Sequence, residues 1–257
     1  MPFTAADANR VAFKYLKEVT FGTTPASPLK LMRYNSHNIG MKPTFVSSNE
    51  IRSDRQRSDT ILTSKTSDGD VNLEWSYGAP DDLIEGALQS TWSAPTTIGP
   101  ITTVSITSAT ANSCIITNSV ASFPAFPVGA WVSVAGFAGV NGPRFFAKVV
   151  SNSTTVLTLT QPSLSTLAVV GAGATVTIQQ QGYIRNGTTP TSFTLESEFA
   201  DIANTFFNHK GMRVSTMNLN VGSSQIVTGS FGFMGLGTAT ATATVTASAT
   251  ATNTAPA

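Results

Sequence analysis

Hydrophobic and polar residues alternate most clearly in residues 190–235, and this stretch predicts the frame around which the rest of the chain is organised. Phe193, Leu195 and Phe199 share one parity, and polar residues lie between them. This alternation is typical of a half-buried strand. Phe231 and Phe233 repeat the pattern near the end of the stretch, and a frame of paired strands is therefore predicted.

Between these strands the apolar spacing changes from two residues to four over residues 202–207. That spacing predicts a short helix with one apolar face. His209 then falls in the last helical turn, where it would interact with the helix dipole. Gly211 suits the left-handed residue that ends many helices.

Two strands follow, over residues 212–221 and 226–235, joined by a turn at residues 222–224. The apolar parity slips by one residue between Val214 and Met217. Such a slip predicts a β-bulge.

The first part of the chain predicts a long hairpin over residues 41–78. Its return strand alternates at residues 71–77, and Asp68-Gly69 is a strong turn signal. Before the hairpin, residues 5–17 fit either a short helix or an extended strand. This N-terminal segment is either an ordinary first element or an arm that reaches a neighbouring subunit.

Residues 80–92 predict a helix, because a proline and two acids stand at its start. Its predicted buried residues are Leu83, Ile84, Ala87, Leu88 and Trp92. Adjacent carboxylates on a helix do not face each other, so Asp81 and Asp82 indicate capping rather than acid–base chemistry.

Composition changes over residues 97–182, which contain no acid and are rich in Val, Ile, Thr, Ser and Gly. Short strand patterns recur at residues 103–107, 114–117, 131–135, 145–150, 155–160 and 174–179. Turn residues separate them, as in a small β-barrel or sandwich. We therefore predict an inserted small all-β domain (97–182) within a discontinuous β-sandwich domain (1–96 and 183–235). A Thr/Ala-rich tail (236–257) follows. For this tail the low-complexity sequence favours a flexible or partly ordered state over a strand added to a neighbour.

Charged residues make up only 11% of the 257 residues and the net charge is +1, so bulk electrostatics give no indication of nucleic-acid binding. Ten of the fifteen basic residues precede residue 66. No secretory signal and no membrane-spanning apolar run is predicted.

The sequence contains no residue pattern that indicates an enzyme active site. The single Cys114 excludes an internal disulfide and is interpreted as a small buried hydrophobe. The two histidines form no metal-binding pair, and no nucleophile elbow or phosphate-binding loop is present. We therefore expect no enzyme activity, no cofactor and no metal site.

Several stretches together resemble the tail tube proteins, or major tail proteins, of long-tailed bacteriophages with non-contractile tails. The resemblance covers roughly residues 11–92 and 183–235, and leaves residues 97–182 and the tail outside it. The stretches that carry it are residues 49–56 (NEIRSDRQ), 71–78 (VNLEWSYG), 81–88, 193–199, 201–207, 211–214 and 226–235 (IVTGSFGFMG).

The resemblance implies a mainly β subunit, a sandwich or half-barrel with one or two short helices. Six such subunits would form a ring, and stacked rings would form the tube through which DNA passes transiently. Other implied partners are the tape measure, tail terminator and distal tail proteins. The protein would be made in the host cytoplasm and end in the virion tail, and the inserted domain would project outward, where it could contact the host surface.

In this family the long hairpin contributes to contacts between rings, so the resemblance implies that the polar hairpin tip has this role here. Its interleaved charges suit contact between identical subunits better than phosphate binding. The implied contact residues are Glu50, Arg52, Asp54, Arg55, Arg57, Asp59, Lys65 and Asp68.

Two alternatives stay open. The first is a tail terminator, baseplate or head decoration protein that never polymerises. The second is a carbohydrate-binding module in the inserted domain, based on Trp131, Phe137 and Phe145.

Overall fold

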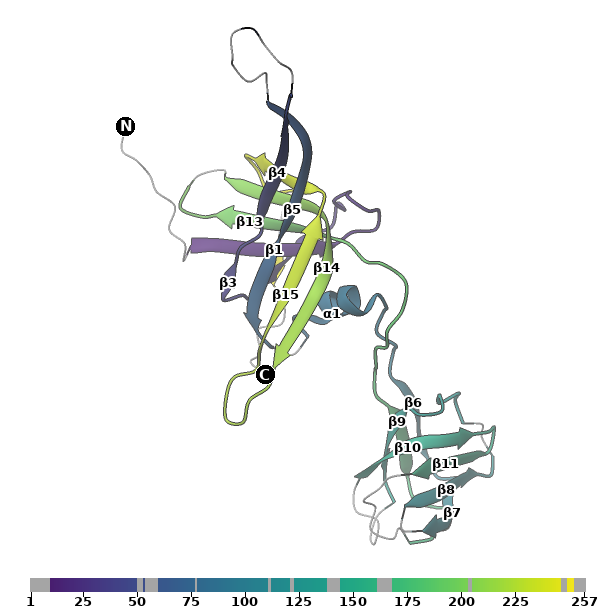
Figure 1. The fold of residues 1–257 in the computed structure, drawn as a ribbon. Coiled ribbons are helices and arrows are strands. Elements are labelled where there is room, and N and C mark those ends of the chain that lie inside the picture. Colours follow the sequence, from purple (N-terminus) through teal and green to yellow (C-terminus); the bar gives the residue numbers. More distant parts are fainter. Residues whose placement is uncertain are drawn as a thin grey trace. The chain divides into compact units, whose positions relative to one another are not determined.

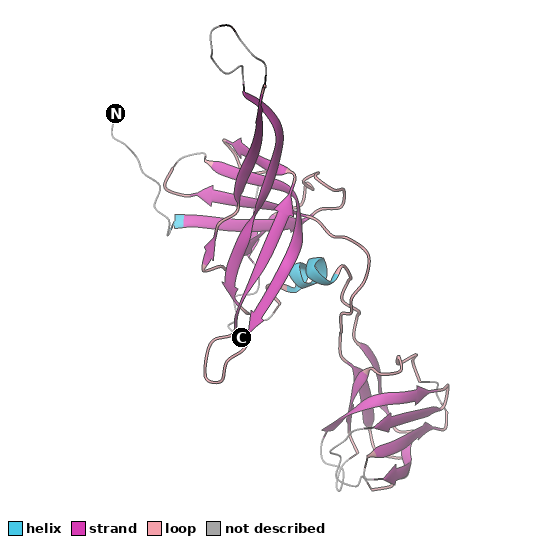
Figure 2. Ribbon diagram, in the orientation of Figure 1, coloured by secondary structure: helices cyan, strands magenta, loops and turns pink. Residues whose placement is uncertain are grey.

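The computed structural model describes residues 10–49, 53, 60–76, 78–110, 112–120, 123–137, 144–160, 168–202, 205–245 and 249–251. The fold is mainly β, with 56% of the described residues in strands and 4% in a helix, which confirms the predicted fold class (Figure 2). The chain divides into two compact units. We call Met1–Thr91 with Arg185–Ala257 the split unit and Trp92–Ile184 the inserted unit.

The split unit contains a ten-stranded sheet and the helix α1 (Figure 1). Its strands are β1 (Val11–Lys17), β2 (Leu29–Met32), β3 (Ser36–His37), β4 (Gly40–Ser47), β5 (Thr60–Glu74), β13 (Phe193–Phe199), β14 (Phe206–Asn220), β15 (Thr228–Gly235), β16 (Gly237–Ala241) and β17 (Ala249–Ala251). They follow the order β17-β2-β1-β13-β14-β15-β5-β3, while β16 pairs with β14 and β4 pairs with β5.

Strand β14 joins the two halves of this sheet. Its first half pairs with β13 and β16, and its second half pairs with β15. The pairing with β13 shifts register near Gly211, whose φ of 64° is left-handed. The left-handed conformation predicted for Gly211 is therefore confirmed, but it belongs to a bulge inside a strand and not to a helix end. The second bulge, predicted between Val214 and Met217, is also confirmed by the register shift between Val214 and Thr216.

One hydrophobic core fills the split unit. Alternate residues of the paired strands supply it, as the parity pattern predicted. Its buried members are Phe13, Tyr15, Met32, Ile39, Val71, Leu73, Leu83, Phe193, Leu195, Met212, Phe231 and Phe233.

The predicted helix is present as α1 (Asp81–Leu88), which is shorter than the predicted 80–92. Of its predicted buried residues only Leu83 is fully buried, and the burial predicted for Trp92 is wrong, because Trp92 lies beyond the helix end and is exposed. Gly86 is buried, and a Cβ there would lie 2.6 Å from Cε2 of Phe193, so glycine lets the helix approach the sheet closely. The Tyr15 hydroxyl donates a 3.1 Å hydrogen bond to the Ala79 carbonyl just before the helix. Lys17 Nζ lies 2.7 Å from Glu85 Oε2 and ties the middle of the helix to β1.

The helix predicted over residues 202–207 is wrong. The chain turns after Phe199, and Phe206 begins strand β14, where it pairs with Glu198 of β13. Residues 203 and 204 lie outside the described part. A short apolar i, i+4 pattern does not distinguish helix from strand, and cross-strand pairing decides here. His209 is accordingly a buried strand residue and not a partner of a helix dipole.

The hairpin of residues 41–78 forms from β4 and β5, but the turn predicted at Asp68-Gly69 is wrong. Both residues lie inside β5, where Gly69 pairs with Phe233. Glycine is needed there because a Cβ would approach the backbone of Ile39 to 2.6 Å. For the N-terminal segment the extended alternative is the one observed, since Val11–Lys17 is strand β1.

The Thr/Ala-rich segment pairs within its own chain, where the sequence favoured a flexible or partly ordered tail. Strand β16 lies against β14, and β17 runs parallel to β2. The Glu196 carboxylate, which is buried, accepts hydrogen bonds from Thr244 Oγ1 at 2.7 Å and from the Val245 amide at 2.8 Å. Polar contacts therefore hold this segment, which explains why its weak apolar pattern gave no signal.

The inserted unit is a single seven-stranded antiparallel sheet in the order β6-β12-β9-β10-β11-β8-β7. Its strands are β6 (Thr96–Ile101), β7 (Val104–Thr110), β8 (Ser113–Asn118), β9 (Trp131–Ala135), β10 (Arg144–Asn152), β11 (Val156–Thr160) and β12 (Val176–Gln180). Strand β6 was not predicted because its Pro100 is unfavourable in a strand interior; β6 lies at the sheet edge, where proline is tolerated.

The sheet of the inserted unit curls around one core, to which β7 to β12 all contribute buried residues. Cys114 belongs to this core, as expected. Phe137 and Phe145 are also core residues, only 1% and 8% exposed, so their predicted role in a sugar-binding surface is wrong. Trp131, in contrast, is 52% exposed.

The two chain connections of the inserted unit meet at Ser93 and Tyr183. The Ser93 amide donates to the Tyr183 carbonyl at 2.9 Å, and the Tyr183 amide donates to Ser93 Oγ at 3.1 Å. The chain therefore enters and leaves this unit at one point.

Candidate assembly surfaces

The most exposed feature of the split unit is the distal part of the β4–β5 hairpin. Strand β5 pairs with β15 from Ser67 onward, whereas its residues 60–66 pair with β4 alone among the described residues. Residues 41–47 and 60–66, which we call the arm, form a two-stranded ribbon whose outer edges have no strand partner in the described part of the chain (Figure 1). Open strand edges are sites where another chain can pair.

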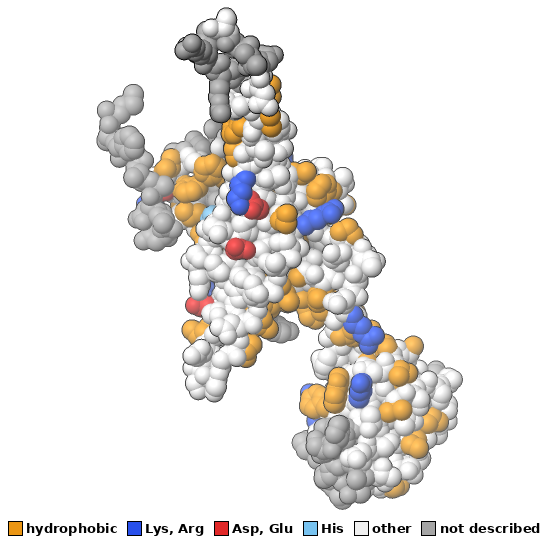
Figure 3. All heavy atoms as spheres, in the orientation of Figure 1, with side chains coloured by type: hydrophobic (Ala, Val, Ile, Leu, Met, Phe, Trp, Pro, Cys, Tyr) orange, Lys and Arg blue, Asp and Glu red, His pale blue; other side chains and the backbone are white. Residues whose placement is uncertain are grey.

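The arm also exposes large apolar side chains (Figure 3). A register shift at Thr44 places Phe45 opposite Leu62 and Val46 opposite Ile61. Because successive residues point to opposite faces, each face of the ribbon carries one apolar pair. The exposed fractions are 57% for Phe45, 40% for Leu62, 53% for Val46 and 62% for Ile61.

Of the predicted contact residues, only Lys65 and Asp68 can be placed. Lys65 is exposed on the arm. Asp68 lies at the arm base and forms an ion pair with Lys42 of the same hairpin at 2.5 Å. The other six, which are Glu50, Arg52, Asp54, Arg55, Arg57 and Asp59, lie outside the described residues. The sequence analysis missed the apolar arm residues, although Phe45-Val46 and Ile61-Leu62 flank the polar run.

The outward face of β5, β14 and β15 includes a second surface, which is polar. Arg213 of β14 lies at its border, opposite Met234 of β15. We define the polar face by Asp70, Asn72, Glu74, Thr216, Asn218, Thr228 and Ser230, whose positions match across the strands. Asn218 Nδ2 donates to Ser230 Oγ at 3.2 Å, so hydroxyl and amide groups bond to each other across this face. No lysine or arginine occurs in residues 69–74, 214–220 or 228–233. In Figure 3 the surface over β15 and the lower part of β5 is mostly uncharged with acidic side chains on it, while basic side chains lie at its upper border. The Lys42–Asp68 ion pair belongs to that border.

The buried carboxylate of Glu18 holds the bend of β14 in place. Its Oε1 accepts from the Gly211 amide at 2.9 Å and from Thr194 Oγ1 at 2.8 Å. Its Oε2 accepts from the Gly22 amide at 2.8 Å and from Ser192 Oγ at 2.7 Å. Four donors stabilise the charge inside the protein, which fits a structural role.

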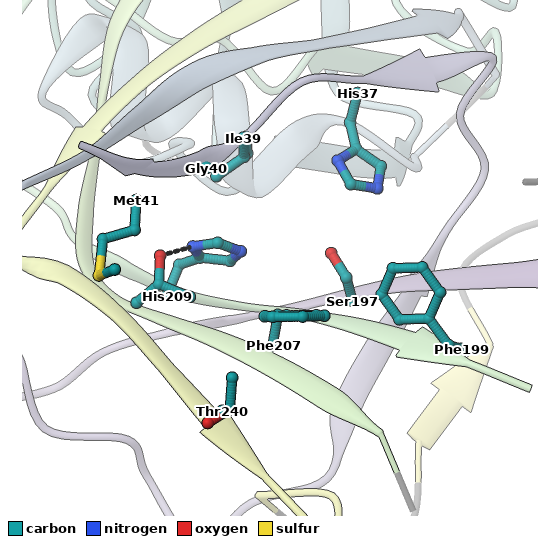
Figure 4. A pocket seen from close by; sticks show the side chains of 10 residues that line it. His37, Ile39, Gly40, Met41, Ser197, Phe199, Phe207, His209 and Thr240 are labelled. Carbon is teal, nitrogen blue, oxygen red and sulfur yellow. Dashed lines mark hydrogen bonds between the residues drawn. The ribbon is translucent and has the colours of Figure 1, made fainter. Parts of the chain in front are cut away.

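A mainly apolar cavity of about 280 Å³ lies between β3, β4 and the β13–β14–β16 sheet (Figure 4). His37 and His209 line it, together with Met41, Phe199 and Phe207. Burial, and to a smaller extent His37, lowers the pKa of His209 to about 4. Burial likewise lowers the pKa of His37.

This cavity lacks the groups that catalysis would need. His209 Nδ1 lies 2.7 Å from Thr238 Oγ1 and 2.9 Å from Ser67 Oγ, but no carboxylate lines the cavity to orient either histidine. Within the described residues no three His, Cys, Asp or Glu side chains come together as a metal site would require. The exposed arm and the polar face are surfaces of the kind that structural subunits present to other protein chains.

A comparison with known protein families identifies the family of the chain. The sequence model of the phage tail tube protein family matches residues 8–257, nearly the whole chain, and the protein therefore belongs to this family. The match includes the inserted unit and the Thr/Ala-rich segment, which the initial resemblance left out. A comparison with curated proteins found no match.

Family membership supports a structural role in the virion tail, with self-association and contacts to other tail proteins, and indicates that the protein is not an enzyme. Among the described residues no helix combines the length and the hydrophobicity that crossing a membrane requires.

Proposed function

We propose that the protein assembles with copies of itself into stacked hexameric rings, which form the tube that delivers phage DNA. The observation that carries this proposal is the arm, a ribbon with two open edges and an uncovered apolar pair on each face. A two-stranded ribbon is only marginally stable in water, so a partner chain paired along the arm would stabilise it.

The arm is the contact between rings in this proposal. Burying a large apolar side chain completely contributes about 1.5–3 kcal/mol, and the four arm side chains are each roughly half exposed. Their complete burial would therefore contribute on the order of 4 kcal/mol per subunit. Repetition around a ring multiplies this contribution, so stacking can be firm even though a single contact is weak. The charged tip residues, with Lys65, would fix the register between rings.

The polar face lines the channel in this proposal. DNA is a dense polyanion, and lysine or arginine side chains on the wall would bind its phosphates. A wall of amides, hydroxyls and a few carboxylates gives DNA no cation to bind. The absence of lysine and arginine from the three strand segments of the polar face supports this placement.

The remaining surfaces would serve the other tail components. The tape measure protein would occupy the channel before DNA does, and the tail terminator and distal tail proteins would bind the two tube ends. The inserted unit would project outward and could touch the host surface. If that is so, deleting residues 97–182 leaves ring formation intact, and a deletion variant that folds but forms no rings would contradict this placement.

Negative-stain electron microscopy of the purified chain over a concentration series tests the proposal. Hollow tubes with a regular axial repeat are expected, either directly or after a tail-tip complex is added as initiator. Image classification of end-on views gives the number of subunits per ring. Closed rings that never stack, even with the initiator, would instead indicate a terminator, baseplate or head decoration protein.

A further inference from the structure

The outward face of β9 and β10 in the inserted unit combines exposed aromatic rings with every cation of that unit. Arg144, Phe146 and Lys148 alternate with the buried residues Phe145, Ala147 and Val149 along β10, so all three point outward. Arg144 and Lys148 are the only charged residues of the inserted unit before Tyr183, since no Asp or Glu occurs anywhere between Trp92 and Ile184.

The register between the strands brings the second aromatic ring to this site. Trp131 of β9 pairs directly with Lys148, and Ser133 pairs with Phe146. Paired residues share a face with Cβ atoms about 5 Å apart, and a diagonal neighbour such as Phe146 lies about 7–8 Å from Trp131, which aromatic rings can span. Trp131 is 52% exposed and Phe146 is 48% exposed.

The two cations stand at either end of Phe146. Four residues of strand separate Arg144 from Lys148, which is about 13 Å. Neither forms an ion pair with any described residue, so both charges are available to a partner. We call Trp131, Arg144, Phe146 and Lys148 the outer-face cluster.

We propose that the outer-face cluster binds a polysaccharide that carries carboxylates. An aromatic ring offers a flat surface to the C–H face of a sugar ring, and the electron-rich ring face attracts the weakly positive C–H groups. The cations then select carboxylates on neighbouring sugars, because the acid-free inserted unit has a positive field that no internal acid cancels. The exposed outer face of two neighbouring strands suits an extended chain better than a small molecule, which would need a concave pocket.

Affinity electrophoresis of the full-length protein tests this proposal. Native gels contain polygalacturonate, its fully methyl-esterified form, or polyglutamate. The ester keeps the sugar rings without the charge, and polyglutamate keeps the charge without the sugars. We expect retardation by polygalacturonate at a concentration at least about tenfold below that needed for either control polymer, as joint aromatic and charge recognition would give.

Three variants assign the binding to the outer-face cluster. Trp131→Ala, Phe146→Ala and Lys148→Gln should each weaken retardation, by about threefold to tenfold for loss of one aromatic contact. Lys210→Gln removes an exposed cation of the split unit, and Val120→Ala trims a side chain of the inserted unit that is 79% exposed. Both controls should behave as the wild type, and all five variants should keep its circular dichroism spectrum.

Several results would overturn the proposal. These are no retardation of the wild type, equal retardation by polyglutamate, or wild-type retardation of Trp131→Ala. Electron microscopy of the same variants separates this site from tube formation, since the outer-face cluster should not affect assembly. If Trp131→Ala folds but no longer assembles, the cluster is a protein contact and not a polysaccharide site.

Discussion

Phe45 on the arm offers the sharpest test of how rings would stack. An aromatic side chain presents about 200 Å², and the residue Phe45 is 57% exposed. About 110 Å² thus remains to be buried, which corresponds to about 3 kcal/mol at about 25 cal/mol per Å². Interfaces realise only part of such area, and alanine keeps one methyl group, so Phe45→Ala should weaken the contact by about 1.5–2.5 kcal/mol per subunit.

This loss should appear in the critical concentration for tube elongation. A weakening of that size raises the critical concentration by about tenfold to seventyfold. The measurement is the protein left in the supernatant after tubes are sedimented, at several total concentrations. The unfolding free energy of the monomer should change by less than about 0.5 kcal/mol, because an exposed side chain contributes little to the fold.

Phe146→Ala is the matched control, since it removes a phenylalanine that is 48% exposed in the inserted unit. Its critical concentration should equal that of the wild type. If Phe45→Ala also elongates at the wild-type concentration, the arm is not a stacking contact, and the reasoning from exposed apolar area is refuted.

Three further predictions concern the fold of the subunit. Glu18→Gln replaces a carboxylate that accepts four hydrogen bonds by an amide with only one acceptor oxygen, and it should lower the unfolding free energy by about 2–3 kcal/mol in urea titrations; unchanged stability would show that the amide satisfies the same donors. His209 has a pKa of about 4 in the folded protein and an ordinary value of 6.5 in the unfolded chain. Between these pH values the unfolded chain binds a proton that the folded protein does not bind. The unfolding free energy should therefore be complete above pH 6.5 and fall by on the order of 3 kcal/mol down to pH 4. A His209→Gln variant should lose most of that slope, and an equal slope would assign the pH dependence to other groups. Burial raises the pKa of the Cys114 thiol to about 11, so a disulfide reagent should modify it only at the rate of unfolding, and fast modification in native buffer would disprove its burial.

Regular alternation made much of the fold predictable. The strands β13 and β15 appear directly in the parity of Phe193 and Leu195 or of Phe231 and Phe233. The half-buried state predicted for β13 is wrong, however, because Phe193 to Ser197 are all buried and both faces of the strand are covered. The second bulge was predictable because a one-residue insertion leaves a visible slip in that parity. The helix α1 was predictable from its proline and acids, which are local signals.

Features that depend on distant pairing were not predictable. Phe206 and Phe207 match a helix locally, and only the pairing with β13 makes them strand. Asp68-Gly69 matches a turn signal locally, but the glycine is needed because the backbone of Ile39, from another segment, packs against it inside β5. The apolar arm residues could have been noticed next to the polar tip, but their exposure follows from the absence of a strand beside residues 60–66 in the described part of the chain.

The Ser93–Tyr183 junction has a consequence for how such a subunit can evolve. Entry and exit of the inserted unit are fixed to each other by hydrogen bonds at a single point. The length of chain beyond that point costs the rest of the fold little, because loop-closure entropy grows only slowly with length. Recombination at this junction could therefore replace one inserted domain by another, while the split unit of the phage tail protein keeps the same frame.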